Sequence, residues 1–318
     1  MFGFKSDFII MDKSDKRGYK DVDLVGSHFR RPIVVALSGN GAIDKESAYG
    51  LCHSADRALE LLFDNSDNNL SLENNIDILG VSYMPFGESG MLMPEDVQNF
   101  VYTVLVPRVS DVAGNLYPID KCKKNLSGVV FYSYCWGAGE VNNIIKFFTF
   151  KLKQYGATNE EISEMLSAMT QISYSPVKLQ FIIPTIFARS ELDSINTEYN
   201  QRYEEIYGEP LQGIKVAPLD NSLGVYSSNL LNKVDDNKDE HSIAYILRDS
   251  NWDIRKHEGI ANPNADCVSL MISWALSRAV ENAIDNHKSD KYVPRTGKMS
   301  EELNSILHSF DYEDIISK

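Results

Sequence analysis

The sequence predicts an α/β protein with three layers, in which helices flank a doubly wound, mainly parallel sheet. Short apolar runs alternate with amphipathic segments along the chain, and this alternation is typical of βα units. The apolar runs are continuous, as expected of strands that are buried on both faces. With 318 residues, 43% of them hydrophobic, the chain is large enough to bury one extended core. We therefore expect a single domain over residues 1–318.

The first third of the chain supplies two of the predicted strands. Residues 1–31 are polar and mixed in character, so we expect an arm or an edge hairpin there. Pro32–Leu37 is the first buried strand, and Asp44 is a candidate N-cap of the amphipathic helix that follows. Ile76–Tyr83 is the second buried strand, and Pro94–Pro107 is expected to be helical.

The middle of the chain repeats the pattern of strand and helix. Gly128–Tyr132 is predicted to be the third strand, and it leads directly into a helix over residues 137–155. A second helix is expected over Asn159–Ile172, because residues 158–161 have a capping-box pattern. Lys178–Pro184 is predicted to be the fourth strand.

The last third of the chain holds a polar insertion, two further strands and a long helix. The polar segment Ser190–Tyr207 suits a core poorly, so a helical cap inserted around residues 185–212 is a candidate. Gly213–Leu219 and Ser242–Leu247 are predicted to be the fifth and sixth strands. Ala265–Ile284 has apolar residues at helical spacing and is predicted to be the final helix.

The charge and the cysteine content narrow the classes of partner. A net charge of −14 repels nucleic-acid phosphates and anionic membranes, so we expect no nucleic-acid partner. No stretch has the roughly 18–20 apolar residues that span a bilayer, and the first residues lack a secretory signal pattern. We therefore expect a cytoplasmic protein, with non-classical secretion left open. The four cysteines lack Cys-x-x-Cys spacing, which argues against a disulfide framework or structural zinc. We expect neither a metal nor another cofactor.

The most informative motif is Ser133-Tyr134-Cys135-Trp136-Gly137, between the third strand and its helix. A sharp strand–nucleophile–helix turn requires small residues two positions before and two after the nucleophile. Ser133 and Gly137 occupy those positions around Cys135. The start of a helix favours a thiolate through the helix dipole, so the motif predicts a nucleophilic cysteine. The competing interpretation is an inert core cysteine, which is how most free cysteines behave.

The segment Tyr134–Gly137 resembles the cysteine elbow of the dienelactone hydrolase branch of the α/β-hydrolase superfamily. The resemblance rests also on the order and spacing of the elements from about Ile33 to Ile284. It implies an α/β-hydrolase-like fold and a catalytic triad in the chain order nucleophile, acid, histidine.

Mapped onto this chain, the resemblance implies a triad of Cys135, Asp220 and His257. Asp220 ends the fifth predicted strand, and His257 precedes the final helix. Asp249 and Asp253 stay open as alternatives for the acid. In such a triad the histidine takes the thiol proton and later protonates the leaving group, while the acid orients the imidazole.

We expect an oxyanion hole beside the nucleophile, formed by two hydrogen-bond donors from different segments of the chain. The elbow aims the backbone N–H of Trp136 at the developing negative charge. The resemblance implies that a second donor follows the first buried strand, where Asn40 or Gly41 is available. The family often has His-Gly at this place, whereas this chain has Ser-Gly-Asn-Gly over residues 38–41. A flexible βα turn is the alternative interpretation of these residues.

The leading functional hypothesis is a cysteine-dependent hydrolase or acyltransferase. It would act on an ester, thioester or amide, a small-molecule or acyl substrate, through an acyl-enzyme on Cys135. A caspase-like peptidase would need a His-Gly at the end of the preceding strand, and Ile76–Tyr83 leads into no histidine. A hypothesis of another class is a non-catalytic interaction protein on a hydrolase scaffold, such as a secreted effector with a protein partner.

Overall fold

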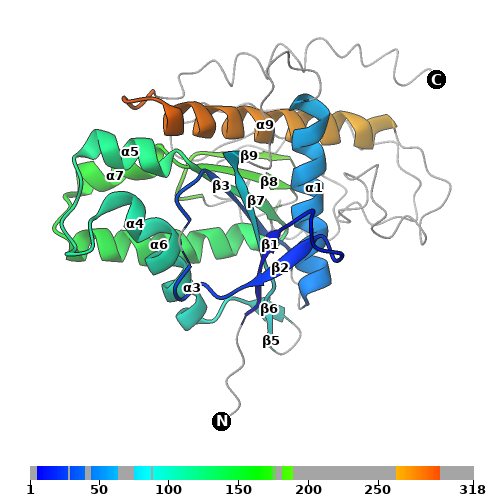
Figure 1. Cartoon of the computed structure of the whole chain (residues 1–318), viewed down its shortest axis with the longest axis horizontal. Coiled ribbons are helices and arrows are strands. Elements are labelled where there is room, and N and C mark those ends of the chain that lie inside the picture. The colour runs from blue at the N-terminus through cyan, green and yellow to red at the C-terminus, as the bar shows by residue number, and fades with distance from the viewer. Residues whose placement is uncertain are drawn as a thin grey trace, which may run out of the picture.

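The computed structural model describes residues 6–27, 29–39, 44–63, 75–86, 89–174, 176, 181–188 and 263–293. Within them the chain has a mixed α/β fold built on a seven-stranded sheet (Figure 1). The strand order is β2-β1-β4-β3-β7-β8-β9. None of the described helices combines the length and the apolar character that crossing a bilayer requires.

The centre of the sheet consists of five parallel strands. They are β4 (Asp77–Val81), β3 (Ile33–Leu37), β7 (Val129–Tyr134), β8 (Thr170–Tyr174) and β9 (Thr185–Ala188). Every residue of β3, β4 and β8 is buried, which explains why β3 and residues 78–81 of β4 are continuous apolar runs in the sequence. The predicted strands at Pro32–Leu37, Ile76–Tyr83 and Gly128–Tyr132 are thereby confirmed.

One edge of the sheet is an antiparallel hairpin made from the polar N-terminal segment. β1 (Phe8–Met11) pairs with β4, and β2 (Tyr19–Val22) pairs with β1. The turn closes with a hydrogen bond from the Asp12 N–H to the Gly18 carbonyl (2.9 Å), and Gly18 has a φ of +80°. The alternative of an edge hairpin for residues 1–31 is therefore correct over this range. A separate two-stranded sheet pairs β5 (Met84–Phe86) with β6 (Ser89–Met91).

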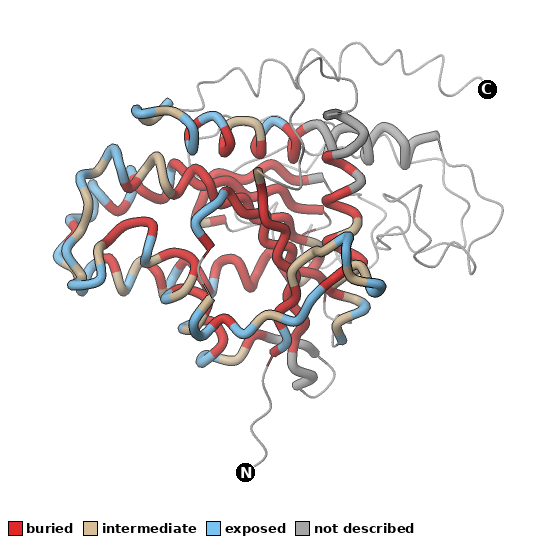
Figure 2. Tube along the Cα trace, in the orientation of Figure 1, coloured by how far each residue is buried: buried red, intermediate tan, exposed pale blue. Residues whose placement is uncertain are grey.

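Helices pack on both faces of the sheet, and each face has its own hydrophobic core (Figure 2). On one face lie α1 (Lys45–Phe63) and α9 (Pro263–Lys288). On the other lie α3 (Pro94–Phe100), η1 (Val101–Leu105), α4 (Val106–Val109), α5 (Ile119–Leu126), α6 (Gly137–Gln154) and α7 (Asn159–Ser167). Alternate residues of each strand face the two cores, so that Val34 points to α1 and α9, and Val35 to α6.

Two predicted helix starts have the expected caps. The Ser47 N–H and hydroxyl both donate to the Asp44 carboxylate at the start of α1 (2.8 and 2.6 Å). At α7, the Glu161 N–H donates to the Thr158 hydroxyl (3.2 Å), and the Thr158 N–H donates to the Glu161 carboxylate (2.8 Å). These reciprocal bonds satisfy amide groups that a helix start leaves without an intrahelical partner.

The helix predicted over Pro94–Pro107 extends to Val109 and contains a π-helical stretch, η1. Pro107 has no N–H and its ring clashes with the carbonyl four residues earlier in a regular α-helix. The wider π turn before it, closed by a bond from the Val106 N–H to the Val101 carbonyl, moves the chain away from that clash.

The sequence prediction is wrong between residues 168 and 184. Helix α7 ends at Ser167, and Thr170–Tyr174 is strand β8 rather than the end of the helix predicted over Asn159–Ile172. Met165, Met169 and Ile172 keep a helical period past the end of α7, so periodicity alone does not locate the boundary. The fourth strand, predicted at Lys178–Pro184, is also displaced, because residues 181–184 are not a strand and β9 begins at Thr185. Helix α5 was not predicted.

Several other predicted elements lie outside the described residues. They are the strands at Gly213–Leu219 and Ser242–Leu247, the segment Ser190–Tyr207, and the candidate cap at 185–212 apart from β9. The final helix, predicted over Ala265–Ile284, is confirmed as α9 and is slightly longer at both ends.

Candidate functional site

The backbone at Cys135 has the conformation of a strained elbow. Cys135 follows the last residue of β7 and comes two residues before α6 begins. Its φ is +54°, and no other non-glycine residue of the described chain has a positive φ. This left-handed conformation costs an L-residue roughly 1–2 kcal/mol, so the surrounding structure must hold it in place. The turn predicted from the sequence is therefore present.

Gly137 shows why the elbow requires a small residue after the cysteine. A Cβ on Gly137 would overlap with the carbonyl oxygen of Leu37, at the end of β3, and would lie 2.7 Å from the carbonyl oxygen of Ser38. Helix α6 can begin this close to β3 only because Gly137 has no side chain. The close approach places the first turn of α6 beside the carboxyl end of β3.

The chain that leaves β3 forms the second wall of the site. A Cβ on Gly39 would lie 3.1 Å from the Cys135 Cβ and 3.1 Å from the Tyr134 ring, so the backbone at Gly39 passes directly over the elbow. The Tyr83 hydroxyl, from the segment after β4, donates to the carbonyl oxygen of Ser38 (2.7 Å) and is buried. The carboxyl ends of β3, β4 and β7 thus meet at Cys135.

The topology of the sheet also identifies the carboxyl ends of β3 and β7 as a place where ligands bind. The chain crosses from β3 through α1 to β4 on one side, and from β7 through α6 to β8 on the other. Because α1 and α6 pack on opposite faces, the strand order reverses between β3 and β7. In open α/β sheets, ligands bind outside the carboxyl ends of the strands at such a switch point. Cys135 and Gly39 lie at this point.

A network of buried polar side chains within the sheet stabilises the end of β7, just before the elbow. Ser133 donates to the Ser173 hydroxyl (2.9 Å) and accepts from the Gln171 amide (3.0 Å), and the Thr185 hydroxyl lies 3.4 Å from the Gln171 side-chain oxygen. All four are at most 1% exposed. Because these bonds join β7, β8 and β9, they order the strand that ends in Cys135. They also occupy the Ser133 hydroxyl, so it is not available as a nucleophile.

Tyr83 lies near both the Cys135 thiol and the Glu140 carboxylate. Burial raises the pKa of Tyr83 well above its ordinary value, and the nearby charges of Glu140 and Cys135 raise this pKa further. Glu140 is 2% exposed in the first turn of α6 and accepts a hydrogen bond from the Asn143 amide (3.2 Å). Glu140 was not among the residues predicted for the site from the sequence.

The other described cysteine side chains have the properties of inert core residues. Cys52 is fully buried, and a Cβ on Gly80 would lie 2.5 Å from its sulfur. Burial raises the pKa of Cys52 far above 9 and that of Cys122 to about 11. The Cys122 sulfur lies 3.3 Å from the carbonyl oxygen of Tyr117, within reach of a weak S–H···O bond. Both thiols therefore stay protonated at neutral pH. Cys267 lies in α9.

Of the other residues predicted for the site, the structure describes Trp136. It is the N-cap of α6, and its side chain makes no capping hydrogen bond. His257, Asp220, the alternative acids Asp249 and Asp253, and the loop residues Asn40 and Gly41 all lie outside the described residues. Within the described part of the chain, no group of three or more His, Cys, Asp or Glu side chains is placed to hold a metal ion.

Comparison with known proteins adds no relative from which a function could be transferred. No model of a known protein family matches the chain, and no curated protein matches it significantly. Fold and geometry thus define a mixed α/β protein with a cysteine elbow at the carboxyl edge of its sheet.

Proposed function

We propose that this protein is a cysteine-dependent hydrolase or acyltransferase that acts on an ester, thioester or amide. The observation that carries the proposal is the strained backbone of Cys135, with a φ of +54° between β7 and α6. Residues held in such conformations concentrate at active sites. The position at the topological switch point supports the same function.

In the proposed reaction, the Cys135 sulfur attacks the carbonyl carbon of the substrate. The thiol proton passes to His257, which Asp220 orients. At the same time the π electrons of the substrate carbonyl group move onto the carbonyl oxygen, which becomes an oxyanion. The Trp136 N–H at the start of α6 donates to this oxyanion, with Asn40 or Gly41 as the second donor. When the tetrahedral intermediate collapses, the leaving group takes the proton from His257 and the acyl group remains on sulfur as a thioester. Water, or an acceptor alcohol or amine, then releases it.

The resemblance to the α/β-hydrolase superfamily is part of this proposal. The small–Cys–Gly elbow and the helices on both faces of a mostly parallel sheet support it. The chain departs from the family pattern at residues 38–39, where it has Ser-Gly in place of His-Gly. This segment is where the family pattern places the second oxyanion donor. Neither strand that neighbours β7 leads into a histidine, because β3 is followed by Ser38 and β8 by Ser175. This order disfavours the caspase-like alternative.

The experiment is to measure turnover of aryl esters and acyl thioesters by the wild type and by two cysteine variants. Cys135→Ala should lower the rate at least about 100-fold, because it removes the covalent nucleophile. Cys122→Ala is the matched control, since it removes a buried, protonated thiol far from the elbow, and it should keep the wild-type rate. A folded Cys135→Ala protein that keeps its turnover would refute the proposal.

A second candidate function is a non-catalytic interaction protein, and the burial of Cys135 favours it. Only 6% of Cys135 is exposed, so a substrate needs an opening that brings it to the sulfur. Labelling with iodoacetamide across pH separates the two functions, with Cys52 and Cys122 as internal references. A catalytic thiol reacts much faster than either reference, whereas equal rates for all three favour the interaction protein.

A further inference from the structure

A hollow lies at the end of the sheet opposite to Cys135. It has a volume of about 840 Å³, which is within the range of small-molecule sites. Phe29 and Arg30, just before β3, and Gly128, just before β7, are among its lining residues. The hollow is therefore at the amino ends of these strands. Because β7 has six residues at about 3.3 Å each, it is roughly 20 Å from the elbow.

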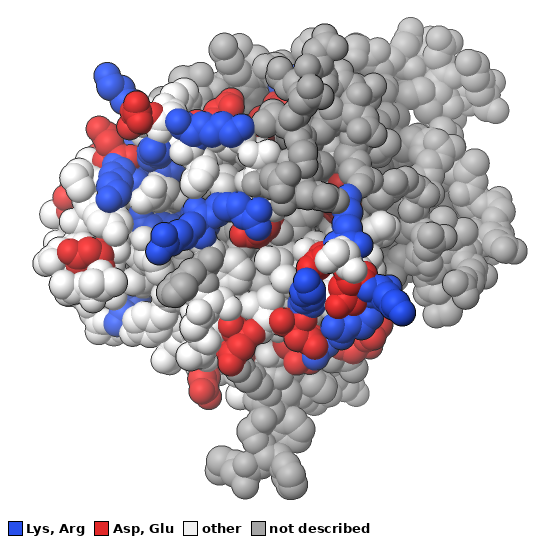
Figure 3. All heavy atoms as spheres, in the orientation of Figure 1, with Lys and Arg blue, Asp and Glu red and all other residues white. Residues whose placement is uncertain are grey.

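Basic residues outnumber acidic ones in the lining of this hollow, although the protein as a whole is strongly acidic. Arg30, Arg108, Lys124 and His287 come from four separate segments, and the one acidic residue of the lining is Asp111. The Asp111 carboxylate faces its own loop, where it accepts from the N–H groups of Ala113 and Asn115 and from the Asn115 amide. On the face of the molecule drawn in Figure 3, by contrast, Lys and Arg side chains are interspersed with Asp and Glu side chains.

The charge of Arg108 is buried without a neutralising carboxylate. Arg108 is 6% exposed, and its guanidinium donates to the backbone carbonyl groups of three residues, Val104, Asn125 and Arg31. Among the described residues, no carboxylate lies within 4.0 Å of it, and the nearby Asp77 is paired with Arg31. A buried cation that is satisfied only by neutral carbonyl groups is costly. An anion bound in the hollow would offset this cost.

The titration of His287 reflects the positive charges beside it. The pKa of His287 is lowered by partial burial and by the charges of Arg108, Lys124 and Lys288. The pKa of Arg108 is lowered to about 10 by its burial. The direction for His287 is that expected of a partly buried imidazole near cations, whereas that for Arg108 reflects its burial alone.

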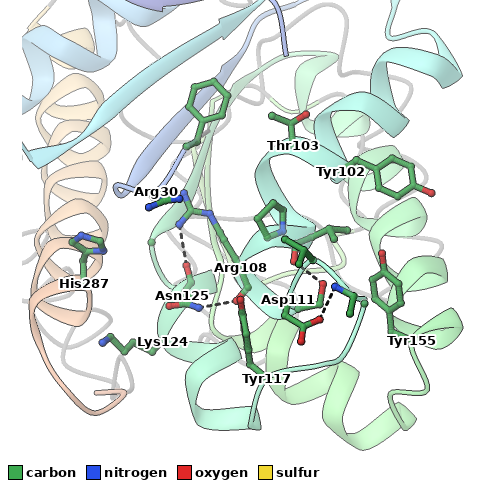
Figure 4. A pocket seen from close by; sticks show the side chains of 18 residues that line it. Arg30, Tyr102, Thr103, Arg108, Asp111, Tyr117, Lys124, Asn125, Tyr155 and His287 are labelled. Carbon is green, nitrogen blue, oxygen red and sulfur yellow. Dashed lines mark hydrogen bonds between the residues drawn. The ribbon is translucent and has the colours of Figure 1, made fainter. Parts of the chain in front are cut away.

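The other side of the hollow is aromatic. Tyr102, Tyr117 and Tyr155 line it; in Figure 4 Tyr102 and Tyr155 lie opposite Arg30, Lys124 and His287, and Tyr117 lies between the two groups. Lys121 lies 3.6 Å from the centre of the Tyr117 ring, which adds positive charge at this rim. The hollow thus has a cationic side for an anion and flat, polarisable surfaces for a ring.

From this arrangement we infer that the hollow bounded by Arg30, Arg108, Lys124, His287 and the three tyrosines binds a small aromatic phosphate. The phosphate group would lie among the cations, and the ring would lie against the tyrosines. This site is separate from the elbow and does not depend on the function proposed for Cys135.

The test is calorimetric titration of the full chain with AMP, adenosine and inorganic phosphate as probes. AMP combines an aromatic base with a phosphate of nearly two negative charges at neutral pH. It should bind at least about tenfold more tightly than either adenosine or inorganic phosphate, because each of these offers only one of the two groups. Its affinity should fall as salt is raised, since the contacts are ionic.

Variants locate the binding in the hollow. Arg30→Gln and Lys124→Gln should each weaken AMP binding about five- to tenfold, as expected for the loss of a charge-assisted contact. Lys16→Gln is the matched control, because it removes an exposed lysine on the β1–β2 turn, and it should change nothing. Cys135→Ala should also bind AMP normally, which separates this site from the elbow.

Three outcomes would overturn the inference. The first is no saturable binding of AMP up to about 10 mM, beyond the millimolar range of weak complexes. The second is equal binding of adenosine and AMP, because the cations would then have no role. The third is an equal loss of affinity in Lys16→Gln, which would indicate a general charge effect rather than a site.

Discussion

At the residue scale, the conformation of Cys135 explains the pattern of small residues around it. Ser133 has a short side chain whose hydroxyl is bonded within the sheet, and Gly137 allows α6 to touch the end of β3. The backbone conformation does not explain why residue 135 is a cysteine, since glycine would adopt a φ of +54° without strain. A strained residue that is not glycine is best explained by the chemistry of its side chain.

This strain can be measured by comparing Cys135→Gly with Cys135→Ala. Both variants lack the thiol, but alanine retains the cost of a left-handed backbone. We expect the glycine variant to have the higher free energy of unfolding by about 1 kcal/mol in urea titrations.

The matched control for this comparison is Cys122, which lies inside helix α5. At this position we compare Cys122→Ala with Cys122→Gly. The alanine variant should have the higher free energy of unfolding by about 1 kcal/mol, because glycine is unfavourable in a helix interior. The same order of stability at both positions would contradict a strained elbow.

At the element scale, Tyr83 links the ends of two neighbouring strands. It follows β4, is 1% exposed, and donates to the carbonyl oxygen of Ser38 directly after β3. Through this bond Tyr83 anchors the segment that passes over Cys135.

Tyr83→Phe tests this role. We expect a loss of about 0.5–1.5 kcal/mol in the free energy of unfolding, since one buried hydrogen bond is removed. The rate of iodoacetamide labelling at Cys135 should change as well, because the segment at Gly39 loses its anchor.

Tyr132→Phe is the control, since its hydroxyl bonds to Ser54 within the other core (3.0 Å). It should have a similar effect on stability and none on the labelling of Cys135. Equal labelling in both variants would show that Tyr83 only stabilises the fold.

At the scale of the whole molecule, buried acids predict how stability depends on pH. Burial raises the pKa of Cys52, Cys122, Tyr83 and Tyr132 above their ordinary values of 9 to 10. Above about pH 9 the unfolded chain releases these protons while the folded protein keeps them. The unfolded state then binds fewer protons, so the free energy of unfolding must fall as pH rises.

We therefore expect the contribution of these four groups to the free energy of unfolding, measured by urea titration, to be constant below pH 9. It should decrease from pH 9 upward. The part due to Cys122 should be complete near pH 11, its pKa in the folded protein. Cys122→Ala should have a shallower decrease between pH 9 and 11, by the contribution of one proton. An unchanged slope would mean that this thiol ionises equally in both states.

Much of the fold could be predicted from local patterns, and the errors have physical causes. Continuous apolar runs located β3, β4 and β7, and capping residues located the starts of α1 and α7. The boundary between α7 and β8 was missed because Met165, Met169 and Ile172 are spaced as on a helix, although β8 is held by its pairing with β7 and β9. Such pairing between distant segments is not encoded in local periodicity.

The sequence by itself determined that a cysteine stands between small residues at the junction of a strand and a helix. The tertiary structure decided what surrounds it. Strand pairing placed β3 beside β7, and this pairing brought Gly39 and Tyr83 to the elbow. Packing of α5 against α9 brought Lys124 and His287 together at the opposite end of the sheet, beside Arg30. Both sites depend on contacts between segments distant in sequence, and packing of the whole core selects those contacts.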